Sequence, residues 1–491
     1  MKTYLFVYLG SALLTLVITP VVIRLARRLN IADAPDVRKA HTKPISHIGG
    51  VAIFLSMMCL TIGVLFLSNV IGDAFQGILP KLIVLLCAAA FIFFVGLIDD
   101  IRTKGLRARI KFLAQIAAAI AVCSAGIRIE KVAIADWLTL DFGWFSWPLT
   151  LLWIVGITNA VNLSDGLDGL AAGLAAIACG VIAVFAVHSG NVVMAVLMLA
   201  LLGSLTGFLF FNFSPAKIFM GDCGSLFLGF TIASASVMCA TKSTALVGIA
   251  LPVLALGIPI FDTLFSMLRR FLERRSMFAP DRRHFHHRLI DLGLKQRQVV
   301  ITIYVITLLC AGLGMFMMVT RNISSLIVFF CILLLLLLIF RVVGSVQLRE
   351  IIEGLRQKHA ITNQTNEEIR GFETAQLHFR KARTFDQWWQ AVCEAAQRMD
   401  FAWVSLKTKD KDGTVQTEVW RPTDAQPDLS AERLADISEV VIMKFPIRND
   451  RKTEPMEFEI AILINGSLES AGHRATLFNR LIDEHEVISR G

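Results

Sequence analysis

The feature that most constrains this chain is a series of apolar blocks, each close to the 20 residues that a helix needs to cross about 30 Å of hydrocarbon. The composition agrees, since 55% of the 491 residues are hydrophobic and 18% are charged, against about a quarter charged in soluble proteins. We therefore predict an all-α polytopic membrane protein with about eleven transmembrane helices, at 4–25, 48–68, 81–98, 112–126, 148–163, 169–187, 191–209, 225–240, 244–267, 299–319 and 323–343. We expect the first block to be retained, because no small-residue cleavage pattern closes it.

The distribution of basic residues predicts the orientation of these helices. With the N-terminus outside, about 21 Lys and Arg residues fall in the odd-numbered connections and about 6 lie on the other side. Cytoplasmic loops carry such an excess, so the odd connections and the C-terminus are predicted to be cytoplasmic. The same rule accounts for the net charge of +9 without any nucleic-acid partner. The nine cysteines have neither metal-site nor disulfide-framework spacing and indicate small core residues.

A change of pattern after Phe340 predicts a separate cytoplasmic part. We expect a transmembrane domain at 1–343, a helical linker at 344–398 and a soluble α+β domain at 399–491. Alternating residues predict strands at 401–408, 414–421, 439–447 and 456–463, followed by a helix at 475–487. This order faintly resembles a GAF-type sensory domain, which would be regulatory; the alternative is a structural or partner-binding appendage.

Two adjacent carboxylates, Asp99 and Asp100, close the third apolar block at its cytoplasmic end. Desolvation at a membrane edge and mutual repulsion both destabilise such a pair. A cation would relieve that cost, and Mg²⁺ takes one or two carboxylates together with substrate phosphates. The alternative for an isolated Asp-Asp is a solvated helix terminus.

A ladder of four polar residues follows the fifth block at steps of three, and two glycines next to them permit close turns. Two carboxamides and two carboxylates at a membrane edge are expensive as packing, so the ladder is typical of a cradle for a nucleotide-sugar or its metal. Its members are Asn159, Asn162, Asp165 and Asp168.

Two further cytoplasmic connections carry chemistry-bearing residues. Asp222 stands between Gly221 and Gly224 before an apolar block, so it is a candidate metal carboxylate beside a helix N-terminus able to accept phosphate. Three histidines and basic neighbours in the ninth connection indicate an anion site, with zinc binding or a simple basic anchor as alternatives. The residues predicted there to bind substrate are Arg282, Arg283, His284, His286 and His287.

Two lysines complete the predicted site. Lys43 lies in the first cytoplasmic loop near Gly49-Gly50, and Lys111 precedes Gln115 by one helical turn at the start of the fourth block. Each lysine is placed to meet a lipid phosphate. The alternative for either one is an interfacial side chain that extends to the headgroups.

Four motifs in one order carry a family resemblance: Leu-Ile-Asp-Asp, Asn-x-x-Asn-x-x-Asp-Gly-x-Asp-Gly-Leu, Gly-Asp-x-Gly-Ser and His-x-His-His. Over residues 1–343 the chain resembles the polyprenyl-phosphate N-acetylhexosamine-1-phosphate transferases, which include the MraY and WecA enzymes. Its histidine loop is similar to the WecA branch, because MraY enzymes typically have three consecutive histidines. Position 103 is Thr where the family motif is acidic, so no third carboxylate is expected in that loop.

The resemblance implies a phosphotransferase of the bacterial inner membrane. Undecaprenyl phosphate would attack a UDP-HexNAc, favoured as UDP-GlcNAc, release UMP and start a lipid-linked envelope polysaccharide such as O-antigen. It implies Mg²⁺, replaceable by Mn²⁺, as cofactor. Asp99, Asp100 and Asp222 would be catalytic, with Asp222 and Asp100 holding the metal. The ladder, the histidine loop, Lys43 and Lys111 would bind substrates. The C-terminal domain lies outside the resemblance, and we expect it to bind a cytoplasmic regulator or to form a homodimer.

Two other classes of protein compete with this interpretation. A transporter or lipid flippase also places ionisable residues in a many-span protein, but along a path near the midplane. Here the carboxylates and histidines are predicted at cytoplasmic helix ends. A receptor that works through its C-terminal domain would leave the four membrane-edge motifs unexplained.

Overall fold

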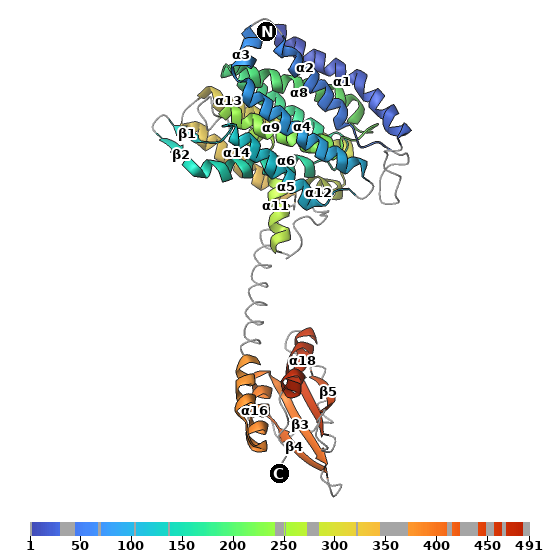
Figure 1. Ribbon diagram of the computed structural model, residues 1–491, viewed down its shortest axis with the longest axis vertical. Helices are drawn as coiled ribbons and strands as arrows, with labels where there is room; N and C mark the ends of the chain where they lie inside the picture. Colours follow the sequence, from blue (N-terminus) through green and yellow to red (C-terminus); the bar gives the residue numbers. More distant parts are fainter. Residues whose placement is uncertain are drawn as a thin grey trace. The chain divides into compact units, whose positions relative to one another are not determined.

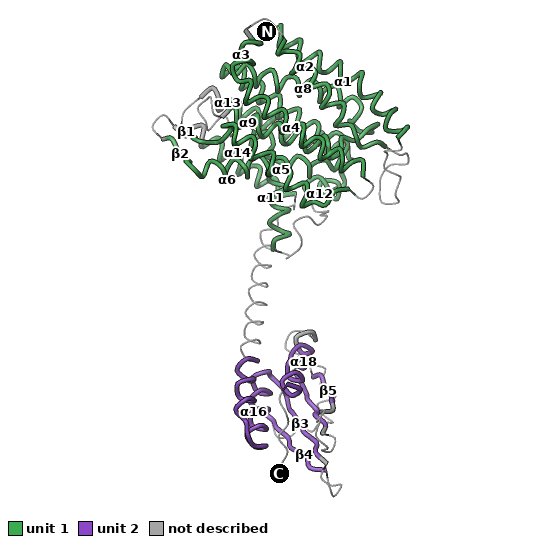
Figure 2. The backbone as a smooth tube through the Cα atoms, viewed as in Figure 1, with its two compact units in different colours: residues 1–351 green, residues 352–491 purple. Residues whose placement is uncertain are grey.

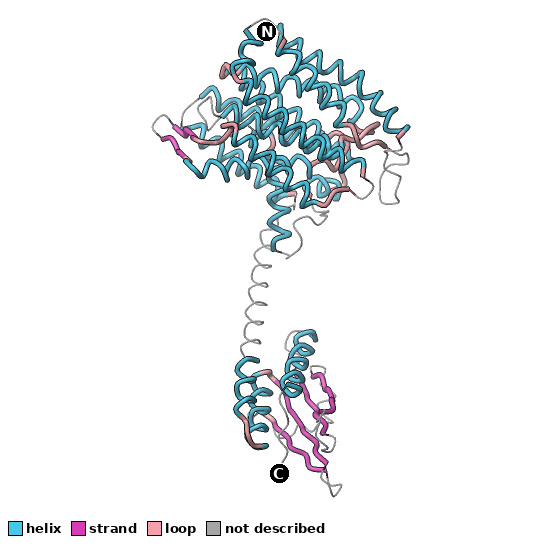
Figure 3. Tube along the Cα trace, in the orientation of Figure 1, coloured by secondary structure: helices cyan, strands magenta, loops and turns pink. Residues whose placement is uncertain are grey.

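The computed structural model describes 2–29, 45–66, 70–102, 105–135, 138–240, 250, 252–272, 284–320, 323–343, 372–409, 415–422, 440–447, 456–463 and 468–484. The chain divides into two compact units, Met1–Ile351 and Ile352–Gly491 (Figure 2). Among these described residues, the regular structure of the first unit is helical apart from one small hairpin, and that of the second combines helices with a sheet (Figure 3).

Apart from the block at 244–267, the predicted apolar blocks correspond closely to helices of the first unit (Figure 1). Seven helices in the described part of the chain are long and apolar enough to cross a membrane, and two more apolar helices are shorter. The main helices are α1 (Lys2–Arg28), α2 (Gly50–Leu65), α4 (Leu79–Ile101), α5 (Ala108–Ser124), α6 (Ser146–Leu163), α7 (Leu170–His188), α8 (Val192–Asn212), α9 (Gly221–Ala240), α11 (Gly257–Leu272), α13 (Gln296–Thr320) and α14 (Ile323–Val342).

Several short elements were not predicted. They are α3 (Val70–Gly77), the 3-10 turn Gly143–Phe145, α12 (Phe285–Asp291) and an antiparallel hairpin of β1 (Lys131–Ala135) and β2 (Leu138–Asp141). The predicted helix at 244–267 falls partly outside the described residues, at 244–249 and 251. Its described part is interrupted by a turn at Leu256, before α11 begins.

Helix α9 lies at the centre of the membrane unit. Of the residues in its apolar stretch, 94% are buried, against 28% of those in the apolar stretch of α1. The reason is that α2, α4, α6, α7 and α8 all pack on α9. The outer helices instead expose large apolar side chains, for example Phe6 at 63% and Phe330 at 62%. An apolar core surrounded by an apolar exterior is the pattern expected of a multi-pass membrane protein in lipid.

The second unit contains a four-stranded antiparallel sheet in the order β4-β3-β6-β5. Its strands and helices are α16 (Phe385–Arg398), β3 (Phe401–Lys409), β4 (Val415–Trp420), β5 (Val440–Ile447), β6 (Met456–Leu463) and α18 (Leu468–Glu484). Alternate residues of the central strands, such as Val404 and Ile460, are fully buried in one core with Trp388 of α16 and Phe478 of α18. The period-two pattern of the sequence therefore places the strands within one or two residues of their observed ends.

Candidate active site

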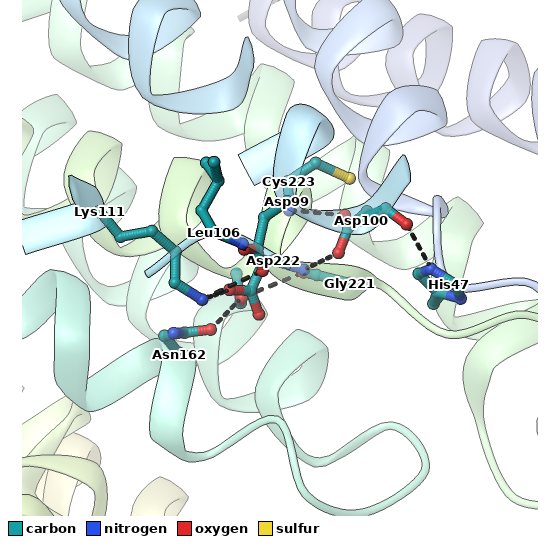
Figure 4. A network of polar contacts seen from close by, with 10 residues as sticks. His47, Asp99, Asp100, Leu106, Lys111, Asn162, Gly221, Asp222 and Cys223 are labelled. Carbon is teal, nitrogen blue, oxygen red and sulfur yellow. Dashed lines mark hydrogen bonds and ion pairs between the residues drawn. The ribbon is translucent and has the colours of Figure 1, made fainter. Parts of the chain in front are cut away.

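Asp99 and Asp100 lie in the last turn of α4, where the helix meets the loop that leads into α5 (Figure 4). Asp99 accepts a hydrogen bond from the backbone N–H of Leu106 through Oδ1. Its other oxygen accepts one from Lys111 Nζ at 3.0 Å. The loop thus folds back over the carboxylate and places Lys111 against it.

Lys111 also joins α4 to α9. Its Nζ lies 2.7 Å from Asp222 Oδ2 as well as 3.0 Å from Asp99 Oδ2, so one ammonium group bridges two carboxylates. All three side chains are largely buried, at 13% exposure for Asp99, 21% for Lys111 and 26% for Asp222. Breaking a pair with little solvent screening leaves an uncompensated charge and is strongly destabilising.

Asp100 holds the start of α9. Its two carboxylate oxygens accept hydrogen bonds from the backbone N–H groups of Asp222 and Cys223, each at 2.9 Å. These donors are among the first-turn N–H groups that a helix leaves unpaired, and a negative charge is favoured there. Asp100 therefore caps a helix from another part of the chain, and in doing so places Asp222 beside Asp99.

The backbone approaches very closely at Gly221. Its φ is +76°, and a Cβ there would lie 1.8 Å from the carbonyl oxygen of His47. The segments preceding α2 and α9 are paired at this point, through Gly49 N–H to Phe219 O at 2.9 Å and Gly50 N–H to Met220 O at 2.8 Å. Only glycine meets both the steric and the conformational requirement.

His47 is a site residue that the sequence prediction missed. Its Nε2 lies 2.7 Å from the backbone oxygen of Asp100, and its Nδ1 is buried without a hydrogen-bond partner. The nearby Gly49-Gly50 pair was a signal for a close approach, but the prediction named Lys43 in this loop. Lys43 lies outside the described residues.

The two asparagines of the polar ladder point to different neighbours. Asn162 Oδ1 accepts a hydrogen bond at 2.7 Å from Ser225 Oγ of α9, which places it beside the carboxylates. Asn159 Nδ2 donates to Gln115 Oε1 of α5 at 2.6 Å. Asn162 therefore lies at the acidic cluster, while Asn159 joins α6 to α5.

The two aspartates of the ladder lie in the turn between α6 and α7. Asp168 is buried and accepts the backbone N–H of Ala216 at 3.1 Å. Burial and the negative charges of Asp222, Asp100 and Asp168 raise the pKa of Asp165 to about 7. Asp165 is therefore close enough to the acidic cluster to be influenced by it, although no described hydrogen bond joins them.

The histidines lie at the start of α12. His284 is buried, and its Nδ1 lies 3.0 Å from Asp262 Oδ2 of α11. His286 adjoins Gly166 of the ladder so closely that a Cβ there would lie 2.8 Å from the ring Nε2. Burial and the neighbouring His287 lower the pKa of His286 to about 4, so its ring is neutral at pH 7. Arg282 and Arg283 lie outside the described residues.

The carboxylate cluster fits a hard divalent cation. Asp99, Asp100 and Asp222 each offer an oxygen, and these oxygens lie within 4.8 Å of one another. Oxygen ligands of this kind suit Mg²⁺. The Lys111 ammonium already lies against two of the three carboxylates, which shows that the cluster attracts positive charge.

Comparisons with known proteins agree with this arrangement. The glycosyl transferase family 4 profile matches residues 82–240, which include all three carboxylates. The chain is 41% identical over 301 residues to a probable undecaprenyl-phosphate N-acetylglucosaminyl 1-phosphate transferase of Bacillus subtilis (strain 168), covering 61% of this chain and 80% of the relative.

Two further relatives extend the comparison. A decaprenyl-phosphate N-acetylglucosaminephosphotransferase of Mycobacterium tuberculosis (strain CDC 1551 / Oshkosh) is 36% identical over 321 residues, covering 60% of this chain and 78% of its own. A phospho-N-acetylmuramoyl-pentapeptide-transferase of Halalkalibacterium halodurans is 32% identical over 333 residues, covering 64% of this chain and 98% of the relative. The chain belongs to the family of polyprenyl-phosphate N-acetylhexosamine-1-phosphate transferases.

Proposed function

We propose that this enzyme transfers N-acetylglucosamine-1-phosphate from UDP-N-acetylglucosamine to a polyprenyl phosphate, undecaprenyl phosphate being the expected acceptor. The relatives named as acting on GlcNAc and polyprenyl phosphates support this substrate pair. None of these relatives supports the transporter alternative. The observation that carries the proposal is the group of three carboxylates and Lys111 at the ends of α4, α5 and α9.

The proposed reaction is a displacement at phosphorus. An oxygen of the polyprenyl phosphate forms a bond to the sugar-bearing phosphorus of the donor, the bond from that phosphorus to the oxygen bridging to UMP breaks, and UMP leaves with the electron pair. One diphosphate linkage replaces another, so little net driving force is expected. Catalysis then depends on positioning and on charge neutralisation.

The contacts suggest different roles for the three aspartates. Both oxygens of Asp100 already accept backbone N–H groups, which favours a supporting role. Asp222 accepts one described hydrogen bond, from Lys111, so it is the better placed to offer an oxygen to Mg²⁺. A bound Mg²⁺ would neutralise charge on the diphosphate. Asp99 would orient the acceptor phosphate, together with Lys111.

Asn162, the two aspartates of the ladder and the histidines would hold the donor substrate, while Asn159, which contacts Gln115 of α5, would support them. Asn162 and Asp165 lie by the acidic cluster. His286 of α12 adjoins Gly166, which follows Asp165 in the turn between α6 and α7. The nucleotide-sugar would then lie beside this contact, with its diphosphate toward His284 and the carboxylates. Arg282, Arg283 and Lys43 stay candidates for the same anions.

The membrane arrangement extends the proposal. We place eleven spans in the bacterial inner membrane, with the N-terminus outside and the acidic site and C-terminal unit in the cytoplasm, where the nucleotide-sugar is made. The distribution of basic residues supports this orientation. Cysteine-scanning with a membrane-impermeant maleimide on intact cells tests it. Labelling of a cysteine placed at Trp144, but not of one placed at Arg107, would agree; the reverse would contradict it.

The C-terminal unit is proposed as a regulatory or partner-binding domain, GAF-like in the order of its elements. Its separate core of Trp388, Val404, Phe458 and Phe478 supports independent folding. Truncation after residue 351 tests whether it is needed for chemistry. We expect turnover to continue without it, whereas a receptor working through this unit would lose all function.

The decisive experiment measures UMP release by the purified protein in detergent with UDP-GlcNAc, Mg²⁺ and undecaprenyl phosphate. We expect lipid-dependent release that Asp99→Asn and Asp222→Asn abolish. Asp73→Asn is the matched control, because Asp73 is an exposed aspartate on α3, outside the site. If no UDP-HexNAc donor gives UMP, the proposed function is wrong.

A further inference from the structure

Asp262 is a buried carboxylate in an otherwise apolar stretch of α11. It is 8% exposed and follows Ile260 and Phe261. An ionised carboxylate in such a position needs hydrogen-bond partners, and an intramembrane or membrane-edge ionisable residue is a functional candidate by default.

Both oxygens of Asp262 are directed at the start of α12. Oδ2 lies 3.0 Å from Nδ1 of His284, and Oδ1 accepts the backbone N–H of Phe285 at 2.9 Å. In the described part of the chain, His284 is the sole ion-pair partner of Asp262. The carboxylate therefore fixes the position of the α12 N-terminus and the plane of the His284 ring together.

We propose that Asp262 is a positioning residue, which keeps a proton on Nδ1 of His284 and so presents Nε2 to the anionic donor substrate. An ionised carboxylate accepts hydrogen bonds and donates none. Nδ1 must therefore carry the proton whether the ring is neutral or charged. This inference rests on the proposed function, since it assigns the ring nitrogen that meets the diphosphate or sugar of the donor.

The fixed proton determines what Nε2 can do. With the ring neutral, Nε2 is an acceptor; with the ring charged, it donates, and a charge-assisted hydrogen bond to a phosphate oxygen is the stronger kind. The negative charge of Asp262 stays beside the ring in both states. In many sites, a carboxylate that accepts the N–H of one ring nitrogen sets the orientation of a functional histidine whose other nitrogen meets the ligand.

The neighbouring histidine links this pair to the polar ladder. The rings of His284 and His286 are parallel, with centroids 5.7 Å apart, and His286 adjoins Gly166. Because burial keeps His286 neutral at pH 7, it can pack against a charged His284 without repulsion. The order Asp262, His284, His286, Gly166 thus connects α11 to the turn that holds Asp165 and Asp168.

Nitrogen-15 NMR of the full-length protein with labelled histidine tests the inference directly, with His284→Gln used to assign the signal. In the wild type we expect Nδ1 to be protonated. Asp262→Asn keeps the shape, and its Oδ1 can still accept the Phe285 N–H. Its amide nitrogen, however, now donates toward Nδ1, so a neutral His284 should move its proton to Nε2.

The same variants are compared in the UMP-release assay. We expect Asp262→Asn to lower kcat at least about 100-fold with a much smaller change in KM, because the charged His284 ring, which donates from Nε2 to the phosphate oxygen in the transition state, loses the carboxylate beside it. Asp291→Asn is the control, since Asp291 is an exposed carboxylate at the other end of α12. It should leave both the NMR signal and kcat unchanged.

The outcomes separate this inference from the proposed function. A wild-type His284 that is neutral and protonated on Nε2 overturns the inference, whatever the activity. Nδ1 protonation with no UMP release in the wild type overturns the proposed function alone. If Asp262→Asn does not fold, Asp262→Glu is used in its place. A Glu variant whose His284 is protonated on Nδ1 and whose kcat lies within about tenfold of the wild type supports the positioning role. A Glu variant whose neutral His284 is protonated on Nε2 and whose kcat is retained refutes it.

Discussion

Lys111 Nζ lies 2.7 Å from Asp222 Oδ2, although the two residues are 111 positions apart in the chain. The same ammonium contacts Asp99 at 3.0 Å. One cation thus holds together carboxylates from the end of α4 and the start of α9, which would otherwise repel each other. The relationship makes Lys111 a structural element of the acidic cluster, in addition to the role in catalysis that we propose for it.

Replacing Lys111 should therefore be costly in two ways. Lys111→Met keeps the apolar stem but leaves Asp99 and Asp222 facing each other without a cation. We expect kcat/KM to fall by about 100-fold or more, the scale for losing one preorganised charge-stabilising group. We also expect the variant to need less Mg²⁺ for half-maximal activity, because the ammonium group no longer competes with the cation for Asp99 and Asp222. Lys111→Arg, which keeps the charge, should retain more activity; equal activity of the Met variant and the wild type would contradict the bridging role.

Gly221→Ala tests the close approach of the two backbone segments. Gly190 is a useful control, because its φ of +69° is similar but a Cβ there would meet nothing within 4 Å. Gly190→Ala should cost about 1 kcal/mol from backbone strain alone. Gly221→Ala adds a clash with His47 O, so it should cost clearly more in thermal unfolding and should displace Asp222. Similar costs for both variants would show that the approach is not tight.

The raised pKa of Asp165 predicts that its ionisation destabilises the fold as the pH rises. Its pKa is raised to about 7 in the folded protein, above the usual 3.9 of an unfolded chain, so ionising it costs folding free energy. That cost is absent below about pH 4 and fully present above about pH 7. In metal-free buffer, Asp165→Asn should therefore unfold at a higher temperature than the wild type at pH 8, with the advantage shrinking at pH 5.

The control for that experiment has the opposite sign. The Gly143 N–H and Lys131 lower the pKa of the exposed Asp141, so this carboxylate stabilises the fold above its unfolded pKa and loses that effect as the pH falls through its lower folded value. Asp141→Asn should reduce stability equally at pH 5 and pH 8. If the difference in unfolding temperature between Asp165→Asn and the wild type is the same at pH 5 and at pH 8, the raised pKa of Asp165 is refuted.

The bond between Asn159 and Gln115 predicts a structural effect rather than a catalytic one. Asn159→Ala removes the donor to Gln115, a residue only 2% exposed. Leaving that buried amide unsatisfied should cost about 1 to 3 kcal/mol of unfolding free energy. Asn162→Ala, next to the acidic cluster, should instead lower kcat/KM with less change in stability. Equal kinetic losses in the two variants would place both residues in the site.

Sequence periodicity predicted the helices well and their partners poorly. Each apolar block was long enough to identify a helix by itself, whereas the contacts of Lys111 with Asp99 and Asp222 depend on how α4, α5 and α9 pack. The ladder shows the difference. Asn159 and Asn162 are three residues apart and lie near one face of α6, yet α6 packs between α5 and α9, so one asparagine meets each neighbour.

Two site residues had signals that the sequence prediction did not use. Asp262 is an ionisable residue inside a predicted apolar block, which is a functional signal on physical grounds. His47 precedes Gly49-Gly50, which marked a close backbone approach. Its contact with the backbone oxygen of Asp100 could not be foreseen, because a side chain that bonds to a distant backbone atom leaves no pattern in the sequence.

The capping of α9 by Asp100 has a consequence for how the protein is made. The two N–H groups that satisfy Asp100 belong to residues 122 and 123 positions later, so the carboxylate has no such partner until α9 has left the ribosome. Helices α4 to α8 are inserted first. Nascent chains that end before residue 221 should therefore keep the Asp99-Asp100 end of α4 hydrated at the membrane surface, and the acidic site closes only when the central helix arrives.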